Sequence, residues 1–326
     1  MKIMYQIDNF IVHCVTKGLS KKTYRSYEQT LVLFSRYLKD ECNITDAKDV
    51  STKIINEYVS YLRNRGKYTV VGNDTTNNIN YPDHRNDYGK RVSDVTINNY
   101  IRNIKVFFSY LYEYGEIRTN PAKKVKHIKV VRKPLTFISD DDFQKLMDSM
   151  DLSKLHEYRD FIVIRTLLDT GMRIGECLSI KVEDLDLKDN VILLHAENTK
   201  GKQSRYVFFS AKLATELKRW LKYKDRYLET DLLFPTTRAT AMQVINFETN
   251  LRKYAKRVGL SDIHPHCFRN NFSKRFLMNG GNIYVLSQIL GHSSVQVTEQ
   301  AYLDLDSKDL QKQYMAFSPL ANMSRR

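Results

Sequence analysis

The stretch from Ile263 to Tyr302 constrains the fold and chemistry of this chain more than any other. It reads IHPHCFRNNF, SKRFLMNGGN, IYVLSQILGH and SSVQVTEQAY. In a helix that starts after Pro265, His266 and Arg269 lie three positions apart and therefore share one face. The stretch thus predicts a helix that presents an imidazole and a guanidinium together.

A second apolar helix is predicted just downstream, from Ile283 to Leu290, and it stops at Gly291. His292 therefore lies at a helix junction and not within a helix. Tyr302 follows ten residues later, where we expect a short mobile helix to carry its phenol. No metal-ligand spacing fits these residues, so the sequence predicts no metal.

These residue types suit the cleavage of a phosphodiester by a tyrosine oxygen. Arginine binds phosphate with a planar fork, histidine transfers protons near neutral pH, and tyrosine is a possible covalent nucleophile. The segments HPHCFRNNF and LGHSS and the downstream tyrosine resemble the C-terminal motifs of the tyrosine recombinases, the phage-integrase and Xer-type site-specific DNA recombinases. The resemblance extends over nearly the whole chain.

The segment TGMRIGECLSI is similar to another motif of this family, its first arginine motif. It comes at the end of a predicted apolar helix, RDFIVIRTLLDTG. Gly171 ends that helix and Arg173 begins the next one, where the backbone amides already attract anions. The resemblance makes Arg173 the earlier of two phosphate-binding arginines and Glu176 a supporting carboxylate.

Two β segments, 191–196 and 205–209, are predicted to form an irregular hairpin across ENTKGKQS. The family carries a catalytic lysine on this turn, and aligning TKGKQSR with it indicates Lys200. Lys202, two residues on, is the alternative.

The N-terminal third reads as helices over 5–15, 21–41, 52–65 and 95–114, the second capped by Ser20, with a long Asn-rich loop at 67–93. Four helices of this kind resemble the SAM-like core-binding domain that starts most tyrosine recombinases. The loop is longer than in compact Xer-type members. It is either a contact to DNA or to a neighbouring protomer, or a tolerated surface insertion.

Positive charge is concentrated in the first part of the chain. Residues 1–134 hold 24 lysines and arginines against 13 acidic residues, a net charge of +11 out of the total +15. An acidic polymer is therefore the natural partner, and the first part is expected to grip DNA. The predicted phosphate contacts are Lys21, Lys22, Arg25, Lys123, Lys124, Lys126, Lys129, Arg132 and Lys133.

We therefore expect a mainly α fold, with an all-α N-terminal domain and a mixed α+β catalytic domain that contains a small antiparallel sheet. The predicted boundaries are 1–118 for the core-type DNA-binding domain and 119–138 for a basic interdomain linker. The catalytic domain is predicted over 139–302, because Ser139 caps a helix with acids in its first turn. Residues 303–326 form a tail with a short amphipathic helix.

The resemblance also implies a reaction. Arg173 and Arg269 would bind the non-bridging oxygens of the scissile phosphate while Tyr302 attacks in line, which yields a 3′-phosphotyrosine and a 5′ hydroxyl. His292 would hydrogen-bond the phosphoryl group. The phosphotyrosine is itself a phosphoester and conserves the energy of the bond that was broken, so rejoining requires neither ATP nor another cofactor.

Proton transfer in this scheme falls to two other residues. His266 is the candidate that accepts the phenol proton, and Lys200 the candidate that protonates the leaving oxygen. Two departures from the family's pattern bear on the site. Asn270 stands where a second histidine is usual, and Tyr302 lies ten residues after His292, where many Xer-type members have nine.

The expected partner is double-stranded DNA with paired recombination sites, bound by a homo-tetramer, with or without an accessory DNA-bending or directionality protein. In the family the C-terminal segment docks on a neighbouring protomer, and docking within its own protomer is the alternative. Four scattered cysteines and the absence of an apolar spanning run favour a cytoplasmic protein without a membrane anchor. A type IB topoisomerase-like enzyme and a catalytically idle DNA-binding protein are the competing functions.

Overall fold

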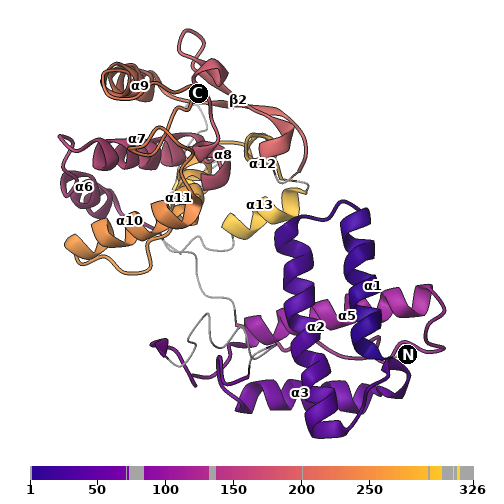
Figure 1. Ribbon diagram of the computed structural model, residues 1–326. Helices are drawn as coiled ribbons and strands as arrows, with labels where there is room; N and C mark the ends of the chain where they lie inside the picture. The colour runs from indigo at the N-terminus through magenta and orange to yellow at the C-terminus, as the bar shows by residue number, and fades with distance from the viewer. Residues whose placement is uncertain are drawn as a thin grey trace. The chain divides into compact units, whose positions relative to one another are not determined.

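A computed structural model of the 326-residue chain describes residues 2–70, 72, 84–131, 137–199, 201–292, 294–302, 311, 314 and 315. The side chains of residues 297 and 300–302 lie outside that description. The chain divides into two compact units, Met1–Arg132 and Lys133–Arg326, each with a hydrophobic core of its own (Figure 1). The predicted fold class, mainly helical with one small antiparallel sheet, is confirmed.

The first unit is helical throughout its described secondary structure apart from an isolated β-bridge. The side chains of Ser20, Ser51 and Ser93 cap its longer helices by accepting hydrogen bonds from backbone N–H groups three residues on. Its helices are α1 (Ile3–Thr16), α2 (Lys21–Cys42), the 3₁₀ turn Ala47–Asp49, α3 (Thr52–Asn64) and α5 (Asp94–Glu113).

Helix α5 packs against α1, α2 and α3 and is the centre of this unit (Figure 1). Large apolar side chains from all four helices meet there, and their burial drives the packing. The fully buried members include Ile7, Phe10, Leu31, Phe34, Tyr58, Ile101, Phe107 and Phe108.

The first part of the basic segment lies against the first unit. Asn98 exchanges two hydrogen bonds with the backbone of Ile128, at 2.9 and 2.8 Å, and Thr52 donates to the carbonyl oxygen of Pro121 over 2.7 Å. Ala122 is fully buried. The basic segment from Pro121 to Ile128 therefore packs against this unit.

The predicted insertion at 67–93 is closed at its base by hydrogen bonds from Lys67 N to the Lys90 carbonyl oxygen and from Gly89 N to the Lys67 carbonyl oxygen, at 2.8 and 2.9 Å. Residues 71 and 73–83 lie outside the described residues.

The second unit combines helices with a sheet ordered β1-β2-β3, antiparallel throughout. Ser139 caps the first helix by accepting from the backbone N–H of Asp142 over 3.1 Å, as predicted. The helices are α6 (Asp140–Asp148), α7 (Leu155–Thr170), α8 (Ile174–Leu178), α9 (Ala211–Lys224), α10 (Val244–Arg257), α11 (Pro265–Met278), α12 (Ile283–Leu290) and α13 (Val295–Tyr302). The strands are β1 (Leu185–Asp186), β2 (Val191–Leu194) and β3 (Arg205–Phe208), with 3₁₀ turns at Val182–Asp184 and Ala196–Asn198.

Helix α7 runs through the core of this unit and packs against α8, α9 and α11 (Figure 1). A buried polar network ties it to α10, because the carboxylate of Asp160 accepts hydrogen bonds from Arg159, Asn250 and Tyr254. Buried charge is tolerated here because every partner is satisfied. The helices that carry the candidate site therefore rest on a fixed support.

Among the described residues, no helix is both long and apolar enough to cross a membrane. Of the C-terminal tail only Gln311, Tyr314 and Met315 are described, all three in helical conformation and exposed. The rest of the predicted tail helix lies outside the description.

Candidate active site

Glu176 is a buried carboxylate at the centre of a cluster of charged side chains. Gly171, with a φ of +66°, ends α7, and the chain turns into α8 at Arg173. The backbone N–H of Arg173 donates to Oε2 of Glu176 over 2.8 Å, and its Nη1 donates to Oε1 over 3.0 Å. The structure thus joins the two residues that the sequence motif paired.

Arg205, the first residue of β3, belongs to the same cluster, and sequence reasoning missed it. Its Nη1 and Nη2 donate to Oε1 and Oε2 of Glu176 over 3.1 and 2.8 Å, a fork that engages both oxygens. Its Nε donates to the carbonyl oxygen of Ile289 over 3.2 Å. The sequence showed only an arginine at the start of a predicted strand. Its partner Glu176 lies 29 positions earlier, so no local pattern indicated the pairing.

Arg269 is held in the interior by two carbonyl oxygens and one histidine. Helix α11 begins at Pro265, as predicted, and Arg269 is only 3% exposed. Its Nη1 donates to the oxygen of Gly171 over 2.7 Å, and its Nη2 donates to the oxygen of Leu290 over 2.8 Å. The guanidinium thereby links the end of α7 to the end of α12.

The same Nη2 lies 2.8 Å from Nε2 of His292, whose Nδ1 lies 2.8 Å from the hydroxyl of the buried Thr298. A guanidinium has donors only, so Nε2 accepts and the proton of the neutral imidazole is on Nδ1. Burial and the positive charge of Arg269 lower the pKa of His292 to about 4. At neutral pH the imidazole is therefore uncharged, with both nitrogens engaged.

The cluster carries excess positive charge. Burial alone raises the pKa of Glu176, but hydrogen bonds from Arg205 and Arg173 outweigh it, so the net pKa lies below the usual value. Burial and the charge of Arg173 lower the pKa of Arg269 to about 9, which leaves its guanidinium charged at pH 7. Three guanidiniums thus surround one carboxylate and one neutral imidazole, an arrangement that favours a bound anion.

His266 stands one turn before Arg269 at the start of α11, and it is exposed. Although the residue as a whole is exposed, partial burial of the imidazole removes water from it and lowers its pKa. The charges of Arg269, His264 and Arg173 lower the pKa further. Its imidazole is therefore neutral at pH 7 and able to accept a proton.

Two predicted site residues lie wholly or partly outside the described residues. Lys200 is not described, whereas Lys202 in the same turn is exposed with a φ of +50°. The backbone of Tyr302 forms the last position of α13, but its side chain is not described.

Three predicted DNA contacts, Lys21, Lys22 and Arg25, lie at the start of α2, and all three are exposed. In the basic segment, the side chains of Lys123, Lys124, Lys126 and Lys129 are open to solvent to a similar degree, whereas Arg132 and Lys133 lie outside the described residues. All of the described members belong to the first unit and are accessible, as a phosphate contact requires.

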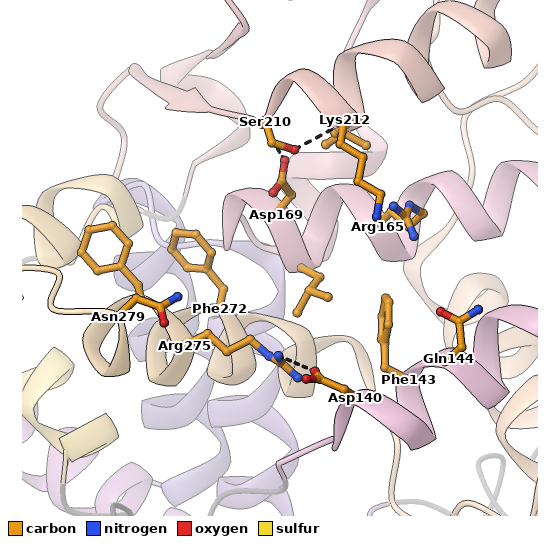
Figure 2. Close-up of a pocket in the computed structure, with 13 residues that line it drawn as sticks. Asp140, Phe143, Gln144, Arg165, Asp169, Ser210, Lys212, Phe272, Arg275 and Asn279 are labelled. Atoms are coloured by element: carbon orange, nitrogen blue, oxygen red, sulfur yellow. Dashed lines mark hydrogen bonds and ion pairs between the residues drawn. The ribbon is translucent and has the colours of Figure 1, made fainter. Parts of the chain in front are cut away.

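An open groove of about 530 Å³ lies elsewhere on the second unit, and its lining includes none of Arg173, Arg205, Arg269 and His292. Figure 2 shows it, with Phe272 of α11 among its labelled side chains. The ring of Phe272 also packs on Gly171, because a Cβ built there would lie 2.3 Å from its Cδ1. Phe272 thus connects the groove to the turn whose carbonyl oxygen binds Arg269.

In the described part of the chain, no group of three or more His, Cys, Asp or Glu side chains is placed to hold a metal ion.

Comparisons with known proteins agree with this architecture. Residues 136–309 match the model of the phage integrase family, and residues 7–78 match that of the phage integrase N-terminal SAM-like domain. The tyrosine recombinase XerC of Thermodesulfovibrio yellowstonii is 29% identical over 97% of each chain. XerA of Saccharolobus solfataricus is 30% identical over 88% of this chain and 86% of its own. A solved structure of the Tn1549 transposon integrase with a circular intermediate DNA covers 98% of this chain and 100% of its own, with a TM-score of 0.73 and 16% identity.

Proposed function

Since the chain belongs to the phage integrase family, we propose that it cleaves and rejoins double-stranded DNA through a covalent bond between Tyr302 and a 3′ phosphate. It is a tyrosine-type site-specific recombinase. The observation that carries the proposed reaction is the cluster in which Arg173 and Arg269 meet around Glu176 and His292.

The two arginines are the proposed binding site for the scissile phosphate. Among the described residues, Arg269 uses three of its five N–H groups on Gly171, Leu290 and His292, which leaves two for phosphate oxygens. The Arg173 side chain is 29% exposed and reaches solvent from the start of α8. Donors fixed in advance stabilise the charge that grows on the phosphoryl oxygens without reorganisation during the reaction.

The reaction needs a base, a nucleophile and an acid. The Tyr302 oxygen attacks phosphorus, its proton passes to His266, and the bond from phosphorus to the 5′ oxygen breaks. Lys200 gives a proton to that oxygen, so a neutral hydroxyl leaves. The lowered pKa of His266 supports its role, because the base must be unprotonated at neutral pH. Strand rejoining is the same sequence in reverse.

His292 contributes in two stages in this scheme. Before DNA binds, its Nε2 accepts from Arg269 and orients the guanidinium. When a phosphate binds, the imidazole takes up a proton at Nε2, which ends the hydrogen bond from Arg269, and Nε2–H then donates to a phosphoryl oxygen. The negative charge of that phosphate raises the pKa of the imidazole and favours this donation.

We assign DNA gripping to residues 1–118 and the basic segment 119–138, and the chemistry to residues 139–302. Exposed lysines at the start of α2 and in the basic segment support the first assignment. For the insertion at 67–93, the alternatives are a contact to DNA or to a neighbouring protomer, and a tolerated surface insertion.

For residues 303–326 we propose docking on a neighbouring protomer within a tetramer assembled on two DNA sites. Tyr314 and Met315 are 64% and 63% exposed, which supports burial against another surface. An accessory DNA-bending or directionality protein is an optional partner of this assembly. A cytoplasmic location accords with four cysteines that form no disulfide with one another.

Covalent trapping tests the chemistry. A nicked suicide substrate loses its short 5′ fragment on cleavage, so the protein stays attached to the 3′ phosphate. Wild type is expected to give a denaturation-resistant DNA adduct, and Tyr302→Phe none. Tyr284→Phe, which alters an exposed tyrosine on α12, is the matched control and should react like wild type. An adduct formed by Tyr302→Phe would refute the assignment, and no adduct from wild type would favour an idle DNA-binding protein.

A plasmid assay separates recombination from topoisomerase-like relaxation. Supercoiled plasmids with paired cognate sites are compared with plasmids that lack them. We expect exchange only between cognate sites. Relaxation of every plasmid without exchange would instead assign a nicking-closing enzyme.

A further inference from the structure

We infer that Arg205 is a positioning residue, which holds the turn between β2 and β3 in place for proton delivery to the leaving oxygen. This inference rests on the proposed function, since it takes a lysine of that turn as the acid. It adds to the reaction a residue that touches neither DNA nor the reacting atoms.

Three separate contacts fix Arg205. Its guanidinium forks onto both carboxylate oxygens of Glu176, at 3.1 and 2.8 Å, and its Nε donates to the oxygen of Ile289 at 3.2 Å. Its Cδ and Nε lie 3.0 Å from the position of a Cβ on Gly291, whose φ is +63°. One side chain thus binds β3 to α8 and to the end of α12, immediately before His292.

The turn itself is held together from within. Ala196 N donates to the hydroxyl of Ser204 over 3.0 Å, and the Thr199 hydroxyl lies 2.9 Å from the carbonyl oxygen of Gln203, to which it donates. Arg205 follows Ser204 directly and pairs with the last residue of β2. These bonds join the described residues on the two sides of the turn, and Arg205 anchors its base to the arginine cluster.

Anchoring matters because proton transfer needs hydrogen-bond reach, about 2.6–3.2 Å between heavy atoms. A displacement of roughly 1 Å costs on the order of 10²-fold in rate. Removal of the Arg205 fork frees the base of the turn from Glu176 and from α12. The acid, whether Lys200 or Lys202, then misses the 5′ oxygen, while the phosphate-binding arginines keep their own hydrogen bonds.

The test uses a substrate that needs no acid. Replacing the bridging 5′ oxygen at the scissile linkage by sulfur makes the leaving group a thiolate, because thiols ionise near pH 8.5. The phosphorus–sulfur bond breaks and the electron pair stays on sulfur without a proton. Single-turnover cleavage of the oxygen and sulfur substrates is compared for wild type, Arg205→Gln and Lys200→Ala.

Arg257 provides a matched control. It also forks onto a buried glutamate, Glu157, at 2.7 and 3.0 Å, and donates to one carbonyl oxygen, that of Ser149, at 3.1 Å. Arg257→Gln therefore removes an equivalent set of bonds from the same unit, outside the arginine cluster. Thermal melting of each variant reports its folding.

We expect Arg205→Gln to cleave the oxygen substrate about 10²-fold more slowly than wild type and the sulfur substrate within about tenfold of it, the pattern of a missing acid. Arg257→Gln should show no difference between the substrates. An equal decrease on both substrates, or no decrease, would overturn the inference. If Arg205→Gln does not fold, Arg205→Lys, which retains the charge but not the fork, must show the same selective rescue. Absence of any adduct from wild type would remove the proposed function itself.

Discussion

Nη2 of Arg269 donates to Nε2 of His292 over 2.8 Å, so a neighbouring positive charge favours the neutral form of this imidazole. The pKa of His292 falls to about 4, chiefly through burial and then through Arg269. An unfolded histidine titrates near 6.5. Between these values the unfolded chain binds a proton that the folded chain excludes, so stability is lost as the pH falls from about 6.5 to about 4.

Thermal melting between pH 7.5 and 4.5 checks this expectation. The melting temperature of the wild type should decline more steeply with acidification than that of His292→Asn, which lacks the titrating group. Parallel curves would show that the imidazole is not held neutral by its surroundings.

Substitutions at Arg173 and Arg269, the two arginines proposed to bind phosphate, should differ in their effect on stability. Arg269→Lys leaves the carbonyl oxygens of Gly171 and Leu290 without their buried donor, which costs roughly 1–3 kcal/mol. Arg173→Lys, at a partly exposed position, should cost less than about 1 kcal/mol. Both should slow cleavage by about 10²-fold or more. Urea denaturation and single-turnover cleavage separate the two effects, and equal destabilisation would contradict the burial argument.

Gly171→Ala should be strongly unfavourable for two reasons. Its φ of +66° costs a residue with a Cβ roughly 1–2 kcal/mol, and the new Cβ would lie 2.3 Å from Cδ1 of Phe272. The carbonyl oxygen that binds Arg269 would shift as well, so cleavage should fall together with stability. Phe272→Leu should recover part of the stability in the double variant, and strict additivity in urea denaturation would refute the steric explanation.

The lysine of the hairpin turn can be identified by paired substitutions. Lys200→Ala should reduce cleavage of a normal oxygen substrate by about 10²-fold. Lys202→Ala should leave the rate within a few-fold of wild type. The opposite result in the covalent adduct assay would transfer the role of acid to Lys202.

The basic segment should contribute affinity that falls with salt. Replacing Lys123 and Lys124 by alanine should weaken DNA binding on specific and unrelated sequences alike. The slope of log affinity against log salt should decrease in magnitude by about 0.9 for each phosphate that the variant no longer neutralises. An unchanged slope would show that these lysines are simply solvated.

Much of this fold follows from local patterns in the sequence. Apolar periodicity located the helices of the first unit, and Ser20 and Ser139 marked the starts of α2 and α6, because both signals lie within a few residues of each other. Pro265 and Gly291 marked the start of α11 and the end of α12 for the same reason. Strand β1, only two residues long, has no alternation that could indicate a strand.

Contacts between distant segments were harder to predict. The pairing of Arg205 with Glu176 joins a strand to a helix start, and nothing in either local sequence indicates the other. The packing of the basic segment through Asn98 and Ile128 was likewise not indicated by the local sequence, whose charge indicated only phosphate contacts. The family motifs indicated Arg173, Glu176, Arg269 and His292, which lie in one cluster, whereas the support from Arg205 required coordinates.

One hydrogen bond connects helix α13 to the arginine cluster. Thr298 bonds to Nδ1 of His292 and stands four positions before Tyr302 in α13, so a shift of this helix that repositions residue 302 must strain or break that bond. The imidazole then loses the partner that fixes its tautomer, and Arg269 loses a stable acceptor. The position of α13 and the orientation of the Arg269 guanidinium are therefore coupled through the two ring nitrogens of one histidine.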